Sequence, residues 1–325
     1  MITFREALNK INGEIEKISY NCQPAELYDP IRYTLSLGGK RIRPALVLLA
    51  YNLYKDDVDK VIPVALGWEI FHNFTLLHDD LMDKAVVRRG KATVHRKWND
   101  NTAILSGDAM LILAYKYIAQ SPASSLKDIL DIFGTTASEI CGGQQYDMHF
   151  EDRTDVSEAE YLEMIRLKTA VMLGACLKTG AVAAGANRED ANNIYDFGIN
   201  IGLAFQVKDD LLDVFGDPEI FGKKVGGDIL CNKKTFLLIN ALNKATENDR
   251  RELLHWLSVV DPDRNEQKIQ SVTEIYNKLN LKVLSEQKMQ YFFEKSVISL
   301  KLLNMPDERT EILYQLAISL MKRDT

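Results

Sequence analysis

"PVALGWEIFHNFTLLHDDLMD", Pro63 to Asp83, is the stretch on which the fold prediction rests. Pro63 suits the first turn of a helix, because proline lacks the N–H group that this turn leaves unbonded. The stretch ends on Asp79, Asp80 and Asp83, where the negative end of the helix dipole disfavours carboxylates. The sequence thus predicts a long helix that ends on crowded like charge, and this crowding needs a cause.

Helical signals continue along the chain. Between Pro122 and Pro218 there is no proline, and apolar residues recur at spacings of three and four. Alternating strand patterns are nearly absent, and no Gly/Ser-rich or Pro-rich linker divides the sequence. We therefore predict an all-α fold, a bundle of many long helices, in one domain over residues 1–325.

Capping residues mark individual helix ends. Ser157 with Glu160 predicts a capping box for a helix through residues 160–178, with Gly180 as its left-handed stop. Asn187 predicts the start of a helix over 188–215, which ends at Gly216.

The composition limits the functional class. The chain has 325 residues, 46% apolar and 26% charged, with a formal net charge of −6. That charge argues against a nucleic-acid partner, because phosphate affinity comes from clustered Lys and Arg. The sequence has no uninterrupted apolar run of about 18–20 residues, the length that would predict a membrane span, and its start lacks a secretory signal. We therefore expect a cytoplasmic protein.

The four cysteines form no C-x-x-C pair and are expected to be buried free thiols: Cys22, Cys141, Cys176 and Cys231.

The stretch "FQVKDDLLDVFGD" repeats the acidic pattern at Asp209, Asp210 and Asp213. Either cluster alone would fit a solvated helix end equally well. Two clusters, both in the last turns of predicted helices, indicate an external cation instead. Carboxylate oxygens are hard ligands suited to Mg²⁺, which is commonly completed by substrate phosphates. Two such faces would hold several ions.

Basic residues lie beside both clusters, as phosphate binding requires. Arg88 and Arg89 follow the first, and Lys223 with Lys224 follow the second. The stretch "GGKRIRP", residues 38–44, adds three more cations on a glycine-bearing turn, although it lacks the P-loop pattern. Alone, this turn would be interpreted as a solvated helix end, and His72 as a structural histidine. Their proximity to the acidic clusters changes that interpretation.

Together these blocks resemble the trans-isoprenyl diphosphate synthases, or polyprenyl synthetases. "GGKRIRP" resembles the first basic motif of that family, and "EIFHNFTLLHDDLMDKAVVRRG" its first Asp-rich motif. "GGQQYDM" and "LKTA" resemble the next two motifs. "FQVKDDLLDVFGD" with "GKKVGGDILCNKKT" resembles the second Asp-rich region. The five blocks stand in the family's order.

The resemblance implies helices around a deep central cavity, a homodimer, and Mg²⁺-dependent head-to-tail joining of isopentenyl diphosphate to an allylic diphosphate. It implies Asp79, Asp83 and Asp209 as metal ligands, supported by Asp80, Asp210 and Asp213. The implied allylic diphosphate ligands are Arg88, Lys168, Lys223 and Lys233. The implied isopentenyl diphosphate ligands are Lys40, Arg43, His72 and Arg89. Thr169 and Gln206 would face the reacting carbons, and Gln144 and Asp147 fill the third motif.

Product length is expected to depend on Phe74 and Thr75, five and four residues before Asp79. The resemblance links an aromatic residue at the first position to short products. The small Thr75, and the lack of a two-residue insertion in "DDLMD", favour geranylgeranyl diphosphate, with farnesyl diphosphate as the alternative. Phe74 could also serve only in helix packing.

The sequence departs from the family pattern at Cys231 and Asn232, where an acidic residue and Gly usually precede the Lys, and at Leu237, where Pro is frequent. The metal ligands are intact, so we expect activity. Competing functions are a terpene cyclase or head-to-head condensing enzyme, a non-catalytic partner subunit and a calcium buffer. A second basic site argues against a cyclase, whole Asp clusters argue against a degenerate subunit, and no EF-hand loop is present.

Overall fold

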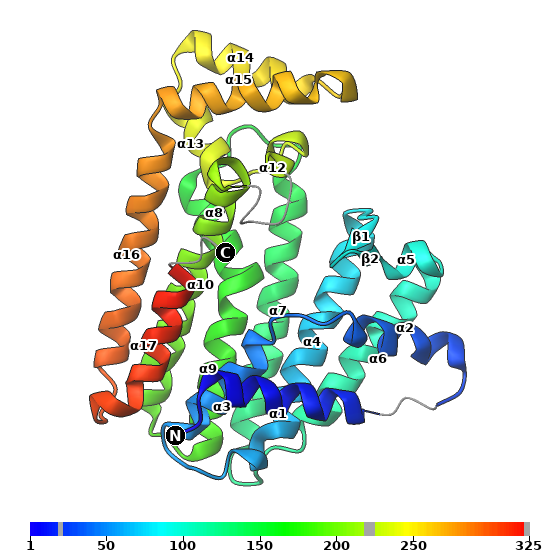
Figure 1. Ribbon diagram of the computed structural model, residues 1–325, viewed down its shortest axis with the longest axis vertical. Helices are drawn as coiled ribbons and strands as arrows, with labels where there is room; N and C mark the ends of the chain where they lie inside the picture. The colour runs from blue at the N-terminus through cyan, green and yellow to red at the C-terminus, as the bar shows by residue number, and fades with distance from the viewer. Residues whose placement is uncertain (19–21, 218–224, 322–325) are drawn as a thin grey trace. The chain divides into compact units, whose positions relative to one another are not determined.

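The computed structural model describes residues 1–18, 22–217 and 225–321, and it confirms the all-α prediction (Figure 1). Within these ranges the strands are β1 (Val87–Arg88) and β2 (Lys91–Ala92), an antiparallel pair. The α-helices are α1 (Phe4–Lys17), α2 (Ala25–Ser36), α3 (Ile42–Asn52), α4 (Ile62–Met82), α5 (Val94–Lys97), α6 (Asp100–Ile118), α7 (Leu126–Phe150), α8 (Glu158–Ile165), α9 (Val171–Ala184), α10 (Arg188–Phe215), α12 (Gly227–Leu230), α13 (Phe236–Lys244), α14 (Glu247–Ser258), α15 (Asn265–Lys278), α16 (Leu281–Lys301) and α17 (Asp307–Met321). A π-helical turn, Arg166–Ala170, separates α8 from α9.

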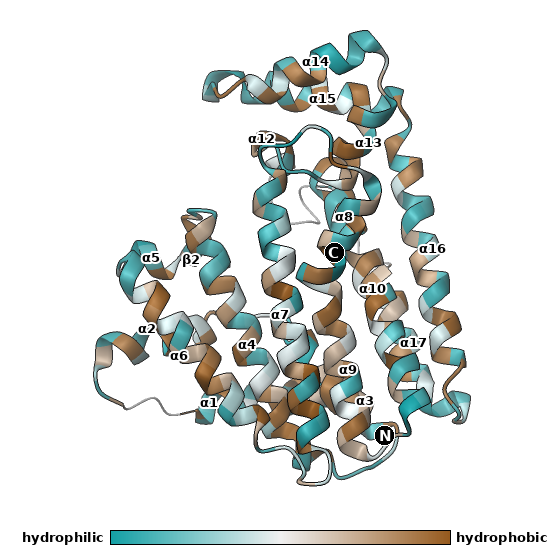
Figure 2. Cartoon of the chain, turned by 180° about the vertical axis from the view of Figure 1, so that it is seen from behind, coloured by the Kyte–Doolittle hydropathy of each residue, from teal (hydrophilic) through white to brown (hydrophobic). Residues whose placement is uncertain are grey.

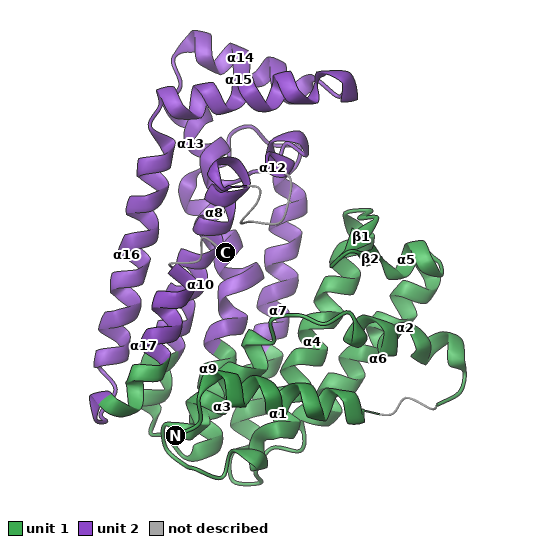
Figure 3. Cartoon of the chain, viewed as in Figure 1, with its two compact units in different colours: residues 1–134, 175–194, 308–312 green, residues 135–174, 195–307, 313–325 purple. Residues whose placement is uncertain are grey.

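The chain forms two compact units (Figure 3). Unit 1 comprises residues 1–134, 175–194 and 308–312, and unit 2 comprises residues 135–174, 195–307 and 313–325. The boundaries fall within α7, α9, α10 and α17. The expectation of a single domain over residues 1–325 stays a prediction.

Unit 1 is built on the close approach of α4 to α6. A Cβ atom on Gly67 would lie 2.9 Å from the Ile118 side chain, and one on Gly107 would overlap the His78 ring. The glycines thus let the two helices pack tightly. Trp68 and Phe71 of α4 meet Phe133 of α7 edge to face, with ring centroids about 5 Å apart.

Unit 2 packs around the second half of α10. Ala204, Val207 and Leu211 are buried against Phe236 and Ile239 of α13. Another helix of this unit, α16, buries residues at spacings of three and four, from Leu281 to Leu300. Figure 2 shows the resulting alternation of hydrophobic and hydrophilic residues along α16, as one buried and one exposed face require.

Most of the predicted caps are confirmed. Ser157 and Glu160 form the capping box of α8, and the Asn187 side chain accepts a hydrogen bond from the Asp190 N–H at 2.8 Å. The prediction for Gly180 is wrong. The helix continues to Ala184, and Gly185, with φ of 88°, follows its end. A Cβ at Gly180 would lie 2.2 Å from the Val47 carbonyl oxygen, so this glycine permits close packing inside unit 1.

The expectation for the cysteines needs correction. The cysteines are free, but only Cys176 is buried, while the other three are exposed. By length and composition alone, one helical stretch among the described residues, Glu158–Ala184, could cross a membrane. Of its most apolar window, 78% is buried inside the protein, so packing in the core accounts for its hydropathy.

Candidate functional site

The first aspartate cluster lies in the last turn of α4, as predicted. Asp83 caps the helix, and Lys84 follows in the left-handed conformation with φ of 53°. The Ala85 N–H reaches back to the Asp80 carbonyl at 2.9 Å, and the Lys84 N–H bonds the Leu81 carbonyl at 3.3 Å. This is the Schellman pattern, which satisfies the last carbonyls without a cation.

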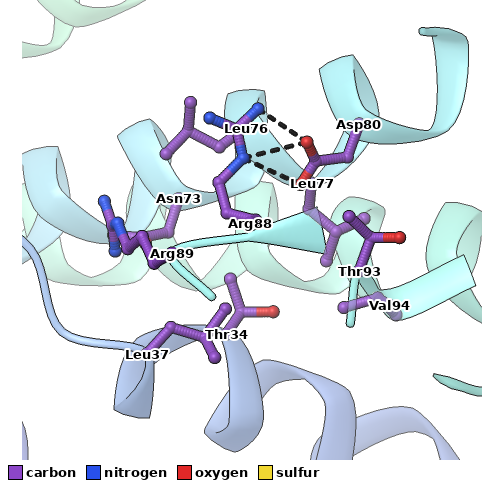
Figure 4. A pocket seen from close by; sticks show the side chains of 10 residues that line it. All are labelled: Thr34, Leu37, Asn73, Leu76, Leu77, Asp80, Arg88, Arg89, Thr93 and Val94. Atoms are coloured by element: carbon purple, nitrogen blue, oxygen red, sulfur yellow. Dashed lines mark hydrogen bonds and ion pairs between the residues drawn. The ribbon is translucent and has the colours of Figure 1, made fainter. Parts of the chain in front are cut away.

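Asp80, the middle carboxylate, is buried and held by Arg88 of β1 (Figure 4). Arg88 Nε donates to Asp80 Oδ1 and Oδ2 at 2.9 and 3.0 Å, and Nη2 donates to Oδ1 at 2.6 Å. Burial raises the pKa of Asp80, and the arginine opposes that shift. Arg88 Nη2 also lies 3.9 Å from Asp79 Oδ2. The pair fixes the short hairpin against the end of α4.

A second basic group of unit 1 surrounds His72. Arg43 Nη1 lies 3.1 Å from His72 Nε2. Because arginine has no acceptor, Nε2 accepts and the ring proton is on Nδ1. Burial, and then Arg43, Arg89, Arg88 and Arg41, hold the pKa of His72 well below its usual value, so the ring is neutral. Arg43 Nε is buried without a hydrogen-bond partner among the described residues. Such a cluster is suited to an anionic ligand.

The glycine turn before α3 meets the hairpin. Gly38 and Gly39 have φ of 77° and 141°, and a Cβ on Gly39 would lie 2.9 Å from the Arg89 guanidinium. Arg89 donates to the Gly38 carbonyl. Lys40 is exposed on this turn. Arg41, in contrast, is buried, and its Nη1 lies 2.5 Å from Glu69 Oε1. Unit 1 thus brings together the predicted residues of the first basic motif, His72 and the two arginines.

The second aspartate cluster, in unit 2, is arranged like the first. Asp210 is buried and accepts hydrogen bonds from Tyr161 Oη at 2.6 Å and the Phe236 N–H at 2.9 Å. Gln206 Nε2 lies 3.3 Å from its other oxygen, and Thr169 Oγ1 lies 3.4 Å from Gln206 Oε1. Burial raises the pKa of Asp210 to about 6. In both clusters, therefore, the middle carboxylate is held by protein groups.

Asp213 anchors the segment that follows. Its Oδ2 accepts from the Asp228 N–H at 2.8 Å, and its carbonyl accepts from the Gly226 N–H at 2.6 Å. Lys233 Nζ lies 3.5 Å from Asp228 Oδ1. Burial alone would lower the pKa of Lys233, but Asp228 and other aspartates of unit 2 raise it. Lys223, a predicted ligand, lies outside the described residues, as do Lys224 and Pro218.

The "GGQQYDM" and "LKTA" motifs also meet within unit 2. Lys168 Nζ lies 2.5 Å from Asp147 Oδ2, and both Lys168 and Thr169 stand on the π-helical turn. A Cβ on Gly143 would lie 2.3 Å from the Lys168 backbone N. Gly143 therefore lets α7 approach that turn, and Gln144 beside it is half-buried. π-Helical turns are frequent at functional sites.

Phe74 and Thr75 are half-buried on α4. The Phe74 ring contacts Phe71, with centroids 5.6 Å apart, and His78, with centroids 4.8 Å apart. Thr75 Oγ1 donates to the His72 carbonyl at 2.8 Å. The aromatic row is compatible with both expectations for Phe74, a wall for the product and a packing residue.

The donor chemistry of the two clusters determines which metal ion they suit. Among the described residues, no group of three or more His, Cys, Asp or Glu side chains could hold an ion by itself. Mg²⁺ needs no such cage, since it is bound by one or two carboxylates plus substrate phosphates. Asp79 and Asp83 on one helix, and Asp209 on the other, are oxygen donors of that kind. The residues fit Mg²⁺ delivered with a diphosphate.

Sequence reasoning missed several residues of these sites. Tyr161 and Asp228 hold members of the second cluster, and Gly143 sets the spacing of two helices. The only signal for Asp228 was its place in the family-like segment "GGD". Tyr161 gave none, because its partner lies 49 residues away.

Comparisons with known proteins agree on one family. The Polyprenyl synthetase family model matches residues 24–279. A geranylgeranyl diphosphate synthase of Methanosarcina mazei is 40% identical over 242 residues, 74% of each chain. A geranylfarnesyl diphosphate synthase of Natronomonas pharaonis is 38% identical over 262 residues, 75% of this chain and 76% of that protein. A solved structure described as a geranylgeranyl pyrophosphate synthase has a TM-score of 0.94 at 40% identity, and the match covers all of both chains.

Gly143→Ala tests the approach of α7 to the π-helical turn. The added methyl would overlap backbone, so we expect the free energy of unfolding in urea to fall by about 1–3 kcal/mol. Gly142→Ala is the matched control, because a Cβ there meets nothing within 4 Å. We expect it to be neutral or slightly stabilising. Equal unfolding free energies for the two variants would contradict the packing described.

Proposed function

The chain belongs to the polyprenyl synthetase family, and on that premise we propose that it joins isopentenyl diphosphate head-to-tail to an allylic diphosphate. The allylic substrate is dimethylallyl, geranyl or farnesyl diphosphate, and the product is a short all-trans prenyl diphosphate. One observation supports this most directly. Each aspartate cluster lies near the C-terminal end of a long helix, has its middle carboxylate fixed by protein, and has basic residues close by. Such paired clusters suit a substrate with a diphosphate leaving group.

For the metal, we propose Asp79, Asp83 and Asp209 as the principal Mg²⁺ ligands, supported by Asp80, Asp210 and Asp213. All are carboxylates, the ligands that Mg²⁺ prefers, and no thiol is among them. The partners of Asp80 and Asp210 favour a supporting role, since their oxygens already accept hydrogen bonds from protein. When bound, Mg²⁺ supplies charge stabilisation for the departing pyrophosphate.

The basic residues are proposed to bind the two diphosphates. Arg88, Lys168, Lys223 and Lys233 would hold the allylic diphosphate, and Lys40, Arg43, His72 and Arg89 would hold isopentenyl diphosphate. The neutral His72, surrounded by arginines, supports the second assignment, because its Nδ1–H can donate to a phosphate oxygen. Gln144 and Asp147 would act beside Lys168, whose ammonium Asp147 already contacts.

The proposed reaction proceeds by ionisation. The cationic side chains stabilise the negative charge that builds on the leaving pyrophosphate as the allylic C–O bond breaks. The double bond of isopentenyl diphosphate, held at its own basic site, then attacks the allylic cation. Thr169 and Gln206 would face the reacting carbons. The proton that is lost passes to the released pyrophosphate, because none of the proposed site residues is an obvious base. Apolar helices must exclude water that would quench the cation.

The decisive experiment supplies the purified chain with isopentenyl diphosphate, each allylic primer in turn and Mg²⁺, and separates the products by length. We expect elongation, and Asp79→Asn or Asp209→Asn should lower kcat on the order of 10²–10³-fold, the range seen when one charge-stabilising group is removed. Asp131→Asn is the control, since Asp131 forms only an exposed ion pair with Lys127.

Failure of the chain to elongate any primer alone would contradict the proposed function. Elongation only after addition of an active synthase would favour the alternative of a non-catalytic partner subunit.

Product length is proposed to depend on Phe74, with geranylgeranyl diphosphate favoured and farnesyl diphosphate as the alternative. Phe74 lies five residues before Asp79, about 7.5 Å back along α4 at 1.5 Å per residue. Phe74→Ala should therefore shift products to longer chains, measured by chromatography of the hydrolysed alcohols. Phe74→Leu, which keeps more bulk, should shift them less. An unchanged chain-length distribution in Phe74→Ala would leave Phe74 with a packing role only.

We also propose that the protein acts as a homodimer, and we expect it in the cytoplasm. Leu105 and Ile112 of α6 are 60% and 61% exposed and stand seven residues apart on one helix face. An exposed apolar stripe of this kind suits a symmetric interface. Light scattering should give about twice the mass of one chain. Leu105→Arg should lower it toward the monomer mass, whereas Lys116→Arg, on the same helix, should not. A monomeric wild-type protein would overturn this proposal.

A further inference from the structure

The turn from Gly226 to Thr235 contains Asp228 and Lys233, and contacts within unit 2 fix it at several points. The Asp228 N–H is bound by Asp213 Oδ2 at 2.8 Å at the start of the turn. The Lys233 N–H closes the turn on the Asp228 carbonyl at 3.0 Å. Lys234 is buried and donates to the Glu151 carbonyl at 2.9 Å at the end of the turn. The middle of the turn depends on a different pair of residues.

Asn232 occupies a left-handed backbone position, with φ of 55°. Asparagine tolerates this conformation better than most residues, and Gly usually stands here in the family pattern. Unlike Gly, it has a side chain to use. Asn232 Nδ2 donates to the Leu257 carbonyl of α14 at 2.9 Å, and its Oδ1 accepts from Lys268 Nζ of α15 at 2.6 Å.

Lys268 is 2% exposed, although lysine is rarely buried. Besides Asn232 Oδ1, its ammonium lies 3.5 Å from the Leu230 carbonyl oxygen and 3.4 Å from that of Val259. Three oxygens thus face the three protons of the ammonium. Burial lowers the pKa of Lys268. The amide of Asn232 makes the shortest of these contacts, so without it the buried charge would be poorly satisfied.

Side chains alternate along the end of the turn. Asn232 faces α14 and α15, and Lys234 is buried beside Glu151, while the Lys233 side chain between them is 45% exposed. Fixing the two neighbours therefore limits where the Lys233 ammonium can go. The Lys233 ammonium lies 3.5 Å from Asp228 Oδ1.

We propose that Asn232 and Lys268 form a clasp that positions Lys233, beside Asp228, for the diphosphate of the allylic substrate. The inference rests on the proposed function, in which Lys233 binds that diphosphate. Asn232 and Lys268 do not touch the substrate; both are positioning residues. A small displacement of a binding group weakens binding and reaction. The departure of Asn232 from the family pattern thus has a structural use in this chain.

Asn232→Gly tests the clasp without straining the backbone, because Gly favours positive φ. We expect the KM for the allylic diphosphate to rise about tenfold, with the KM for isopentenyl diphosphate unchanged. Amide hydrogen exchange over residues 228–233 should become faster. Asn232→Asp keeps an acceptor for Lys268 and should retain most of the wild-type affinity. Asn280→Gly is the matched control, since Asn280 also has positive φ, 53°, but is exposed and makes no side-chain cap bond.

Lys268→Met should raise the same KM, and the double variant with Asn232→Gly should be no worse than the more impaired single variant, because both remove one interaction. Additive effects, or wild-type exchange and KM in Asn232→Gly, would overturn the clasp. Should Lys268→Met fail to fold, Asn232→Gly alone decides. Hydrogen exchange requires no catalysis, so an inactive wild-type protein would refute the proposed function while the exchange comparison still tested the clasp.

Discussion

The arrangement of both sites depends on one electrostatic constraint, the placement of three carboxylates at or near the C-terminal end of a helix. The dipole and mutual repulsion both disfavour this crowding. The protein relieves part of it at the middle position of each cluster. Asp80 is bound by Arg88, and Asp210 by Tyr161 and the Phe236 N–H. Each bond also fixes a neighbouring segment, the β1–β2 hairpin in unit 1 and the start of α13 in unit 2. The costly carboxylates thereby organise the basic residues around them.

The need to hold these charged groups in place also explains features of the surrounding backbone. Gly39 leaves room for the Arg89 guanidinium, and Gly143 leaves room for the turn that presents Lys168. The turn after α10 is tied to Asp213 at one end and to Asn232 and Lys268 in the middle. The charged groups proposed to bind substrate are thus held in place by buried side chains or by backbone groups. Pre-organised groups of this kind need little rearrangement when a diphosphate binds.

Local sequence signals predicted much of this structure. The all-α class, the capping box at Ser157, the Asn187 cap and the position of both clusters followed from patterns within a few residues. The prediction for Gly180 was wrong because glycine near a helix end usually marks the end of the helix, whereas here the close approach of the Val47 carbonyl of α3 requires a residue without a side chain. Partners distant in sequence, such as Tyr161 with Asp210 and Asn232 with Lys268, gave no local signal. Cysteine exposure likewise depends on packing that composition does not reveal.

The central claim is a division of roles, in which Asp79, Asp83 and Asp209 bind the metal while Asp80 and Asp210 are held by protein groups. A crystal structure with Mg²⁺ and a non-hydrolysable allylic diphosphate analogue tests it most directly. We predict Mg²⁺ on Asp79, Asp83 and Asp209, with Asp80 still bound to Arg88 and Asp210 to Tyr161. Mg²⁺ bound directly by Asp80 or Asp210, with those contacts broken, would contradict the account.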